Sequence, residues 1–342
     1  MAERKQLNKR LLFVVTEDWT FVSHRFHLAI AAIEKGYHVG LLSKFTRHRD
    51  IIKNAGVQVF DWSLNRGSIN PLLEMRSVLE VVSAIKNFQP NLLHAVAIKP
   101  VVYSAIACRY TGVDSRVFAL GGLGFIFSSS KFFAQLLRPL LVFVFRILLS
   151  GHQSCLILQN SDDRSVLLSA GVMDADQIRL IRGAGVDTNY FFPQSVPDGI
   201  PLVVLPARML WDKGVLEFVE AARTLNGKGV NARFALVGPT DPHNPESVSD
   251  KQLDQWVKEG DVEWWGHRYD MRNVYRQATI VCLPSYREGF PNVVLQAGSL
   301  MVPSIVSDIN GCNEIIQNEN NKLSVSMHKG IHDVNNCARS PT

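Results

Sequence analysis

Short apolar runs alternate with amphipathic segments of helical length along most of the chain. In the first half they predict strands at 11–16, 37–43, 57–60, 91–95 and 115–119, with helices between them such as 24–35 and 71–88. In the second half they predict strands at 202–206, 232–237, 262–265, 279–283 and 303–307 and helices at 213–226, 249–258, 270–277, 291–300 and 311–317. Strands that alternate with helices are typical of parallel sheets, so the pattern predicts an α/β fold.

A loop rich in proline interrupts this alternation near the middle of the chain. It runs from Phe191 to Pro201 and contains three prolines and one glycine. Because 342 residues suffice for two domains of ordinary size, we predict two tandem Rossmann-like domains with a cleft between them. The first is expected over 1–192 and the second over 193–322. The periodicity fails after Asn318, so 323–342 is expected to be an irregular and poorly ordered tail.

Composition and charge exclude several classes of protein. The chain is 46% hydrophobic with a net charge of +5, which excludes a disordered protein. No basic cluster or nucleic-acid motif is present, so a nucleic-acid partner is not expected. The cysteines are odd in number and form no CxxC pair, which argues against structural zinc and a disulfide framework and favours a reducing compartment; they are Cys108, Cys155, Cys282, Cys312 and Cys337. The first apolar run ends at Glu17 and Asp18 and predicts a buried strand rather than a secretory signal.

The most hydrophobic stretch of the chain is 132–149. Arg138, Pro139 and Arg146 interrupt it, which argues against a membrane-spanning helix. On a helix, Lys131, Arg138 and Arg146 fall within a sector of about 80°. An apolar helix with one basic stripe suits the surface of an anionic membrane. The alternative is a core helix whose arginines face solvent or an anionic ligand.

The first half offers three groups of candidate residues, each weak alone. His24 and Arg25 follow the first strand, where a dinucleotide-binding fold would carry GxGxxG; that motif is absent, which argues against NAD and FAD. His94 ends a strand and Lys99 begins the next helix. The glycines around Gly122 follow another strand. Each group has a structural alternative, namely capping, packing or a tight turn.

The second half contains a sharper pattern. Arg208 lies just past strand 202–206, and Lys213 begins the next helix. Two cations at a strand-to-helix junction favour an anion site, because the N–H groups of a helix N-terminus add to their charge; a solvated surface pair is the alternative. Glu288 lies in a loop, Pro291 suits the first turn of the following helix, and Gln296 falls on that helix.

Taken together, these segments resemble the retaining glycosyltransferases of family 4, which have the two-domain GT-B fold. The resemblance runs from about Leu11 to about Asn320 and depends on the order of the motifs. They are Ser23-His24-Arg25, His94 to Pro100, Gly122-Leu123-Gly124, Gln159 to Asp163, Arg182 to Asp187, Arg208 with Lys213-Gly214, Glu288-Gly289-Phe290-Pro291-Asn292, and Gly311 to Glu314. The chain looks most like the bacterial subgroup that builds capsule, O-antigen and other glycans on polyprenyl diphosphate carriers.

The resemblance implies a role for each matching residue. The phosphate-binding Arg and Lys of the family match Arg208 and Lys213, which would stabilise charge on the departing nucleoside diphosphate without a metal or another cofactor. Glu288 matches the first Glu of the Glu-x7-Glu motif and would bind donor-sugar hydroxyls. Gly289, Phe290, Pro291 and Asn292 complete that loop, and Gly122, Leu123 and Gly124 would line the donor site. His24 and Arg25 would face the acceptor, with His94 and Lys99 nearby.

The implied activity is transfer of a hexose or N-acetylhexosamine from a nucleotide sugar, with UDP favoured by the subgroup, to a lipid-linked glycan. The enzyme would be cytoplasmic and peripheral on the inner face of the cytoplasmic membrane. Two departures from the family leave alternatives open. The second Glu of the motif is Gln296, and the chain ends before the family's last helices. A truncated, inactive remnant and a GT-B sugar-nucleotide epimerase are therefore the competing hypotheses.

Overall fold

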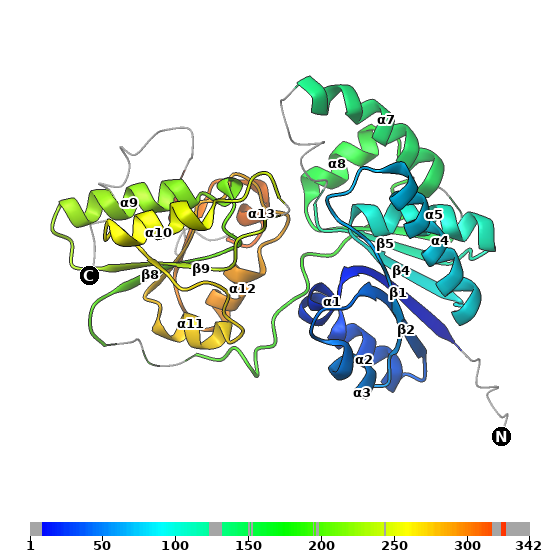
Figure 1. Cartoon of the computed structure of the whole chain (residues 1–342), viewed down its shortest axis with the longest axis horizontal. Coiled ribbons are helices and arrows are strands. Elements are labelled where there is room, and N and C mark those ends of the chain that lie inside the picture. Colours follow the sequence, from blue (N-terminus) through cyan, green and yellow to red (C-terminus); the bar gives the residue numbers. More distant parts are fainter. Residues whose placement is uncertain are drawn as a thin grey trace. The chain divides into compact units, whose positions relative to one another are not determined.

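The computed structural model describes residues 9–122, 132–149, 151, 153–193, 195, 198–242, 244–316 and 323–325. They divide into two compact units, Met1–Ala184 and Gly185–Thr342 (Figure 1). The division lies earlier than the predicted boundary at 192. Phe191 packs with Tyr275 in the core of the second unit, and the guanidinium carbon of Arg272 lies 4.2 Å from the ring centroid of Phe192. These aromatic side chains therefore belong to the second unit.

Unit 1 contains a seven-stranded parallel sheet in the order β3-β2-β1-β4-β5-β6-β7. Its strands are β1 (Arg10–Glu17), β2 (His38–Lys44), β3 (Gln58–Asp61), β4 (Leu92–Val96), β5 (Arg116–Leu120), β6 (Ser154–Leu158) and β7 (Ile178–Leu180). Alternate residues of β1 face opposite sides, as the period of a strand requires. Leu12 and Val14 enter one apolar core, while Phe13 and Val15 enter the other.

Helices cover both faces of this sheet (Figure 1). One face packs against α1 (Asp18–His24), α2 (Phe26–Glu34) and α3 (Arg49–Asn54). The other packs against α4 (Pro71–Phe88), α5 (Ile98–Thr111), α7 (Phe132–Leu149) and α8 (Ser161–Ser169). Since both faces are buried, the strands read as apolar runs, which is why five of the seven were predictable from the sequence.

The predicted helix 24–35 is wrong in its first part. The segment directly after β1, where no helix is predicted, forms α1, and a break at Arg25 separates it from α2. The buried Asp18 anchors this arrangement: its carboxylate accepts hydrogen bonds from the backbone N–H groups of Thr46, Arg47 and His48 at 2.8–2.9 Å. Burial opposes ionisation, yet these bonds hold the pKa of Asp18 below its ordinary value.

Unit 2 contains a six-stranded parallel sheet in the order β10-β9-β8-β11-β12-β13. Its strands are β8 (Leu202–Pro206), β9 (Arg233–Val237), β10 (Glu263–Trp264), β11 (Ile280–Leu283), β12 (Ser304–Ser307) and β13 (Leu323–Val325). The helical segments are a 3-10 turn, η1 (Trp211–Lys213), with α9 (Val215–Gly227), α10 (Asp250–Lys258), α11 (Met271–Gln277), α12 (Asn292–Ser299) and α13 (Asn310–Asn313). Helices α9 and α10 share one core with the sheet, whereas α11 and α12 share another.

The irregular tail predicted from 323 begins differently in the structure. Leu323–Val325 forms β13, which pairs in parallel with β12. The backbone bonds of the sheet edge, rather than any apolar periodicity, place these three residues. The rest of the predicted tail, 326–342, lies outside the described residues.

Candidate functional site

The site in unit 2 lies where the strand order reverses. From β8, one crossover leads to β9 on one side, and a later one leads to β11 on the other side. Ligands of doubly wound sheets bind at the carboxyl ends of the strands at such a point. Two loops meet there: 207–214 follows β8, and 284–291 follows β11. The predicted Arg208, Lys213 and Glu288 are all in these loops.

Lys213 and Glu288 form an ion pair across the switch point. The ammonium Nζ lies 2.8 Å from Oε1 of Glu288 and also donates to the backbone oxygen of Arg287 at 3.3 Å. Ser285 donates to the same Oε1 at 2.8 Å. The side chains of Lys213 and Glu288 are 18% and 13% exposed, so solvent screens this pair less than it would a surface pair. An ammonium group has three donors, and two are used here, so one can bind a ligand.

Arg208 is held by a carboxylate that the sequence analysis missed. Its Nη1 donates to Oδ2 of Asp241 at 2.7 Å. Asp241 follows β9, and its backbone N–H donates to Oγ of Ser247 at 2.9 Å. The signal for Asp241 was its place at the carboxyl end of the strand beside β8. A guanidinium has five donors, so Arg208 keeps several for an anion.

Two glycines let the backbone segments of this site approach closely. Gly214 has φ +71°, and a Cβ added there would overlap the backbone carbonyl of Pro284. A Cβ at Gly311 would overlap the carbonyl oxygens of Glu288 and Gly289. The loop 284–291 is therefore packed against backbone on two sides. This explains how a loop can hold the Glu288 carboxylate in one position.

The loop ends one residue later than predicted. Pro291 is the N-cap of α12 rather than a residue of its first turn, and α12 begins at Asn292. Phe290 is partly buried. On α12, the side-chain oxygen of Gln296 accepts a hydrogen bond of 3.0 Å from the hydroxyl of Tyr275. This bond fixes the amide oxygen of Gln296, and its NH₂ group keeps two donors.

The charges of Glu288 and Lys213 both affect the pKa of the nearby Cys312 thiol. Burial, with a contribution from Glu288, raises the pKa of its thiol to about 12. The thiol therefore stays protonated near neutral pH and is a poor nucleophile. Cys312 packs as an apolar residue in the core beneath the loop.

The predicted residues of unit 1 take different positions. His24 and Arg25 lie at the break between α1 and α2, and His94 is buried in β4. Lys99 donates to the backbone oxygens of Asn65 and Ser68 and to Glu74, so it fastens the loop before α4. Gly122 lies just past β5. Leu123 and Gly124 lie outside the described residues.

The predicted basic stripe on α7 differs from the structure in one respect. Arg146 donates to the backbone oxygens of Ala170 and Gly171 after α8, so it serves as a cap for that helix end. Arg138 is partly buried, and Lys131 lies outside the described residues. Within the described ranges, no helix is long and apolar enough to cross a membrane.

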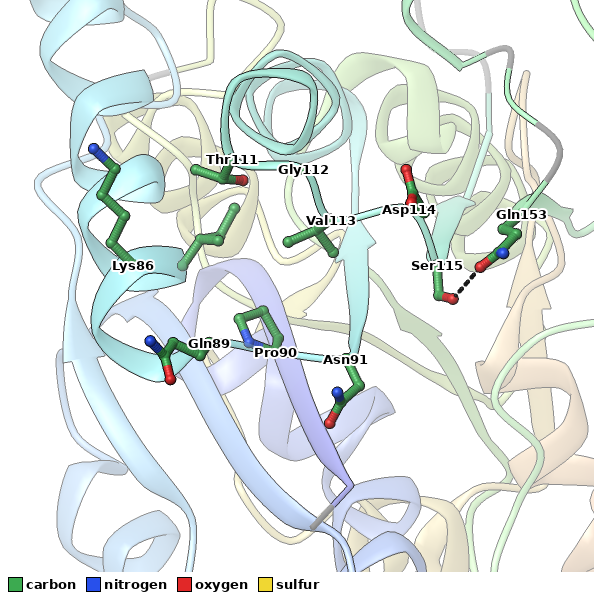
Figure 2. Close-up of a pocket in the computed structure, with 11 residues that line it drawn as sticks. Lys86, Gln89, Pro90, Asn91, Thr111, Gly112, Val113, Asp114, Ser115 and Gln153 are labelled. Carbon is green, nitrogen blue, oxygen red and sulfur yellow. Dashed lines mark hydrogen bonds between the residues drawn. The ribbon is translucent and has the colours of Figure 1, made fainter. Parts of the chain in front are cut away.

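A polar pocket of about 540 Å³ lies at the amino ends of the strands of the unit 1 sheet (Figure 2). Asn91 precedes β4 there, while Asp114 and Ser115 precede β5. Ser115 donates to the side-chain oxygen of Gln153 at 2.8 Å. This edge carries the amino ends of the strands, where ligands of such sheets do not ordinarily bind. The pocket contains none of the predicted site residues.

The described residues bring together no group of three or more His, Cys, Asp or Glu side chains suited to a metal ion. Metal-independent chemistry stays a prediction, as does the cleft between the two domains.

Both units match known protein families. Residues 10–160 match the model described as "Glycosyl transferase 4-like", and residues 200–335 match "Glycosyl transferases group 1". The chain belongs to the GT4-type glycosyltransferases and is a glycosyltransferase. The predicted family and fold class are therefore confirmed.

Two of the matching curated relatives carry names that describe transfer of a sugar to an undecaprenyl-diphosphate-linked glycan. The chain is 29% identical over 281 residues to the N,N'-diacetylbacillosaminyl-diphospho-undecaprenol alpha-1,3-N-acetylgalactosaminyltransferase of Campylobacter jejuni, covering 78% of this chain and 72% of that protein. It is 27% identical over 268 residues to the UDP-Gal:alpha-D-GlcNAc-diphosphoundecaprenol alpha-1,3-galactosyltransferase of Escherichia coli, covering 74% of this chain and 66% of that protein.

Solved structures show the same GT-B fold. The Anabaena protein HepE, determined in complex with UDP and glucose, matches with a TM-score of 0.68 and 18% identity, over 90% of this chain and 83% of that one. The lipopolysaccharide glycosyltransferase WaaG matches with a TM-score of 0.66 and 12% identity, over 90% of this chain and 83% of that one.

We predict that Gly214→Ala destabilises unit 2 and displaces the loop 284–291. Gly229→Ala is the matched control, because Gly229 has a similar φ of +74° but no atom within 4 Å of an added Cβ. The free energy of unfolding of the control should fall by about 1 kcal/mol, from backbone strain alone. Gly214→Ala should lose at least about 2 kcal/mol more, measured as the free energy of unfolding. Equal losses in both variants would show that the contact with Pro284 is unimportant.

Proposed function

We propose that the chain is a retaining glycosyltransferase that moves a hexose or N-acetylhexosamine from a UDP-sugar to a polyprenyl-diphosphate-linked glycan, in the biosynthesis of a surface polysaccharide. The ion pair between Lys213 and Glu288 at the switch point of unit 2 is the observation that carries this proposal. An ammonium group, which suits phosphate, lies within one hydrogen bond of a carboxylate, which suits sugar hydroxyls, and this supports the proposed roles. The names of the relatives from Campylobacter jejuni and Escherichia coli support the class of acceptor.

Each residue of the site has a role that its contacts support. Transfer breaks the bond between the anomeric carbon and the diphosphate, so negative charge gathers on the departing UDP. Arg208 and Lys213 stabilise that charge through their remaining N–H donors, and this electrostatic stabilisation is the largest contribution that the site offers. Within the described residues, Oε2 of Glu288 has no hydrogen-bond partner, so it accepts bonds from donor hydroxyls. The acceptor hydroxyl attacks the anomeric carbon, and we assign no protein nucleophile.

The two competing hypotheses have less support. The names of the relatives from Campylobacter jejuni and Escherichia coli describe sugar transfer to lipid-linked acceptors, which favours a transferase over an epimerase. The hydrogen bonds that hold Arg208, Lys213 and Glu288 argue against an inactive remnant.

Arg208→Ala and Lys213→Ala should each reduce turnover at least tenfold, about 1.4 kcal/mol of transition-state stabilisation, because each removes a cation from the leaving diphosphate. Turnover is measured with a UDP-sugar and a lipid-linked acceptor. Lys258→Ala, an exposed lysine on α10, is the control for the loss of one positive charge and should keep the wild-type rate. Near-normal rates in both site variants would contradict the placement of the phosphate site.

We further propose that the enzyme works as a peripheral protein on the inner face of the cytoplasmic membrane, with α7 as the contact. Leu140, Phe143 and Ile147 are 57%, 59% and 42% exposed, and their spacing places them on one face of the helix. Arg146 is occupied by the end of α8, so this apolar face supplies the insertion, with Lys131 and Arg138 as the remaining basic residues of the segment.

The double variant Leu140→Ser/Phe143→Ser should lose at least tenfold in affinity for vesicles containing phosphatidylglycerol, measured by co-sedimentation. The control is Ile200→Ser, which removes an apolar side chain 52% exposed on unit 2 and should bind like wild type. Arg138→Gln should weaken binding to these anionic vesicles and leave binding to vesicles of neutral lipid unchanged. Unchanged binding of the double variant would exclude α7 as the contact.

A further inference from the structure

Two arginines on α11 (Figure 1) contact aromatic rings from the start of unit 2. Arg272 and Arg276 are four residues apart, so their side chains lie on one face of the helix. The guanidinium carbon of Arg272 lies 4.2 Å from the ring centroid of Phe192 and 5.2 Å from that of Tyr190. The guanidinium carbon of Arg276 lies 5.8 Å from the centroid of Phe192. Both cations are therefore within cation–π distance of the same phenyl ring.

Neither arginine forms an ion pair with a carboxylate in the part of the chain that the structure describes. The acidic residue nearest in sequence, Asp270, is bonded elsewhere. Its Oδ1 caps α11 by accepting from the backbone N–H of Asn273 at 3.1 Å, and it also accepts from the hydroxyl of Tyr190 at 3.2 Å. Two like charges therefore lie close together with one carboxylate in their neighbourhood, so the cluster keeps a net positive charge.

Each of these arginines also has a buried donor without a partner. The Nε atoms of Arg272 and Arg276 are shielded from solvent, and neither forms a hydrogen bond among the described residues. By contrast, Nε of Arg233 in the same unit donates to Glu263 at 2.7 Å. A buried polar group without a partner is uncommon, and an ion is one of the reasons for it. Cations that have lost part of their hydration and have no carboxylate partner are stabilised by an anion.

We propose that Arg272 and Arg276, ordered by Phe192, form an anion site for a phosphate group. A guanidinium is planar and donates two parallel hydrogen bonds to phosphate oxygens, and stacking on an aromatic ring restricts its orientation. Two such groups on one helix face suit an anion with several oxygens. The phosphate is a free anion or the headgroup of an anionic phospholipid, since both present the same oxygens. The site shares no residue with the proposed donor site or with α7, so it does not depend on the proposed function.

The direct test follows the guanidinium Nε–H signals of Arg272 and Arg276 by NMR, assigned from their loss in Arg272→Gln and Arg276→Gln. Sodium phosphate should shift both signals saturably, because the bound anion changes the electrostatic field at each guanidinium. Sodium chloride at the same ionic strength should not. Phe192→Leu keeps both charges but removes the ring that orders them, so the dissociation constant for phosphate should rise at least about threefold.

Co-sedimentation with phosphatidylglycerol vesicles distinguishes the two sources of phosphate. The double variant Arg272→Gln/Arg276→Gln is compared with Lys251→Gln/Lys258→Gln, which removes two positive charges from exposed positions of α10 in the same unit. If the ligand is a lipid headgroup, the arginine variant should bind the vesicles at least about fivefold more weakly than the lysine variant. Equal vesicle affinity of the two variants, with saturable phosphate shifts in wild type, identifies the ligand as a free phosphate.

Each variant is first shown to be folded by thermal unfolding. Phosphate shifts that do not saturate, or that chloride reproduces, overturn the site. A wild-type dissociation constant in Phe192→Leu overturns the role of the ring and leaves only a diffuse effect of charge. UDP affinity reports on the proposed donor site and should be unchanged in Arg272→Gln/Arg276→Gln, so failure of one site is distinguishable from failure of the other.

Discussion

The bond between Lys213 and Glu288 depends on two loops, 75 residues apart in sequence, that meet at one point of the sheet. Strands β8 and β11 are neighbours, so their carboxyl ends bring the loops together. Gly214 then lets its backbone contact Pro284, and Gly311 receives the carbonyl groups of the Glu288 loop. Without these contacts, a carboxylate on a loop would not stay within 2.8 Å of its lysine. The donor chemistry that we propose depends on this constraint.

The two units use the same sheet order in different ways. In both sheets the first strand is third in the order, and the direction of the crossovers reverses beside it. In unit 2 the cations are paired with carboxylates, Arg208 with Asp241 and Lys213 with Glu288. In unit 1 the carboxylates of Glu17 and Asp18 accept hydrogen bonds from backbone N–H groups and neighbouring side chains. In the function that we propose, the paired cations of unit 2 exchange their carboxylate partners for an arriving phosphate.

The sequence was informative wherever burial on both faces made a strand apolar. The strands 202–206 and 279–283 were predicted to within a residue of β8 and β11. It was less informative where long-range bonds decide. Helix α1 follows β1 directly because Asp18 is held by residues 46–48, and no local pattern indicates this. Likewise, no local pattern indicates that Lys99 and Arg146 donate hydrogen bonds to backbone carbonyls 31 and 24 residues away in sequence.

Calorimetric titration of UDP, GDP and ADP into wild type and Gln296→Glu tests the donor site most directly. Tyr275 already donates to the side-chain oxygen at this position, so we expect a carboxylate there to keep that bond and to have a second oxygen for a hydroxyl of the nucleotide. We expect saturable binding of UDP in preference to the other two nucleotides, and binding about tenfold tighter in Gln296→Glu, which gains one charge-assisted hydrogen bond. A folded protein that binds none of the three nucleotides in either form would contradict this expectation.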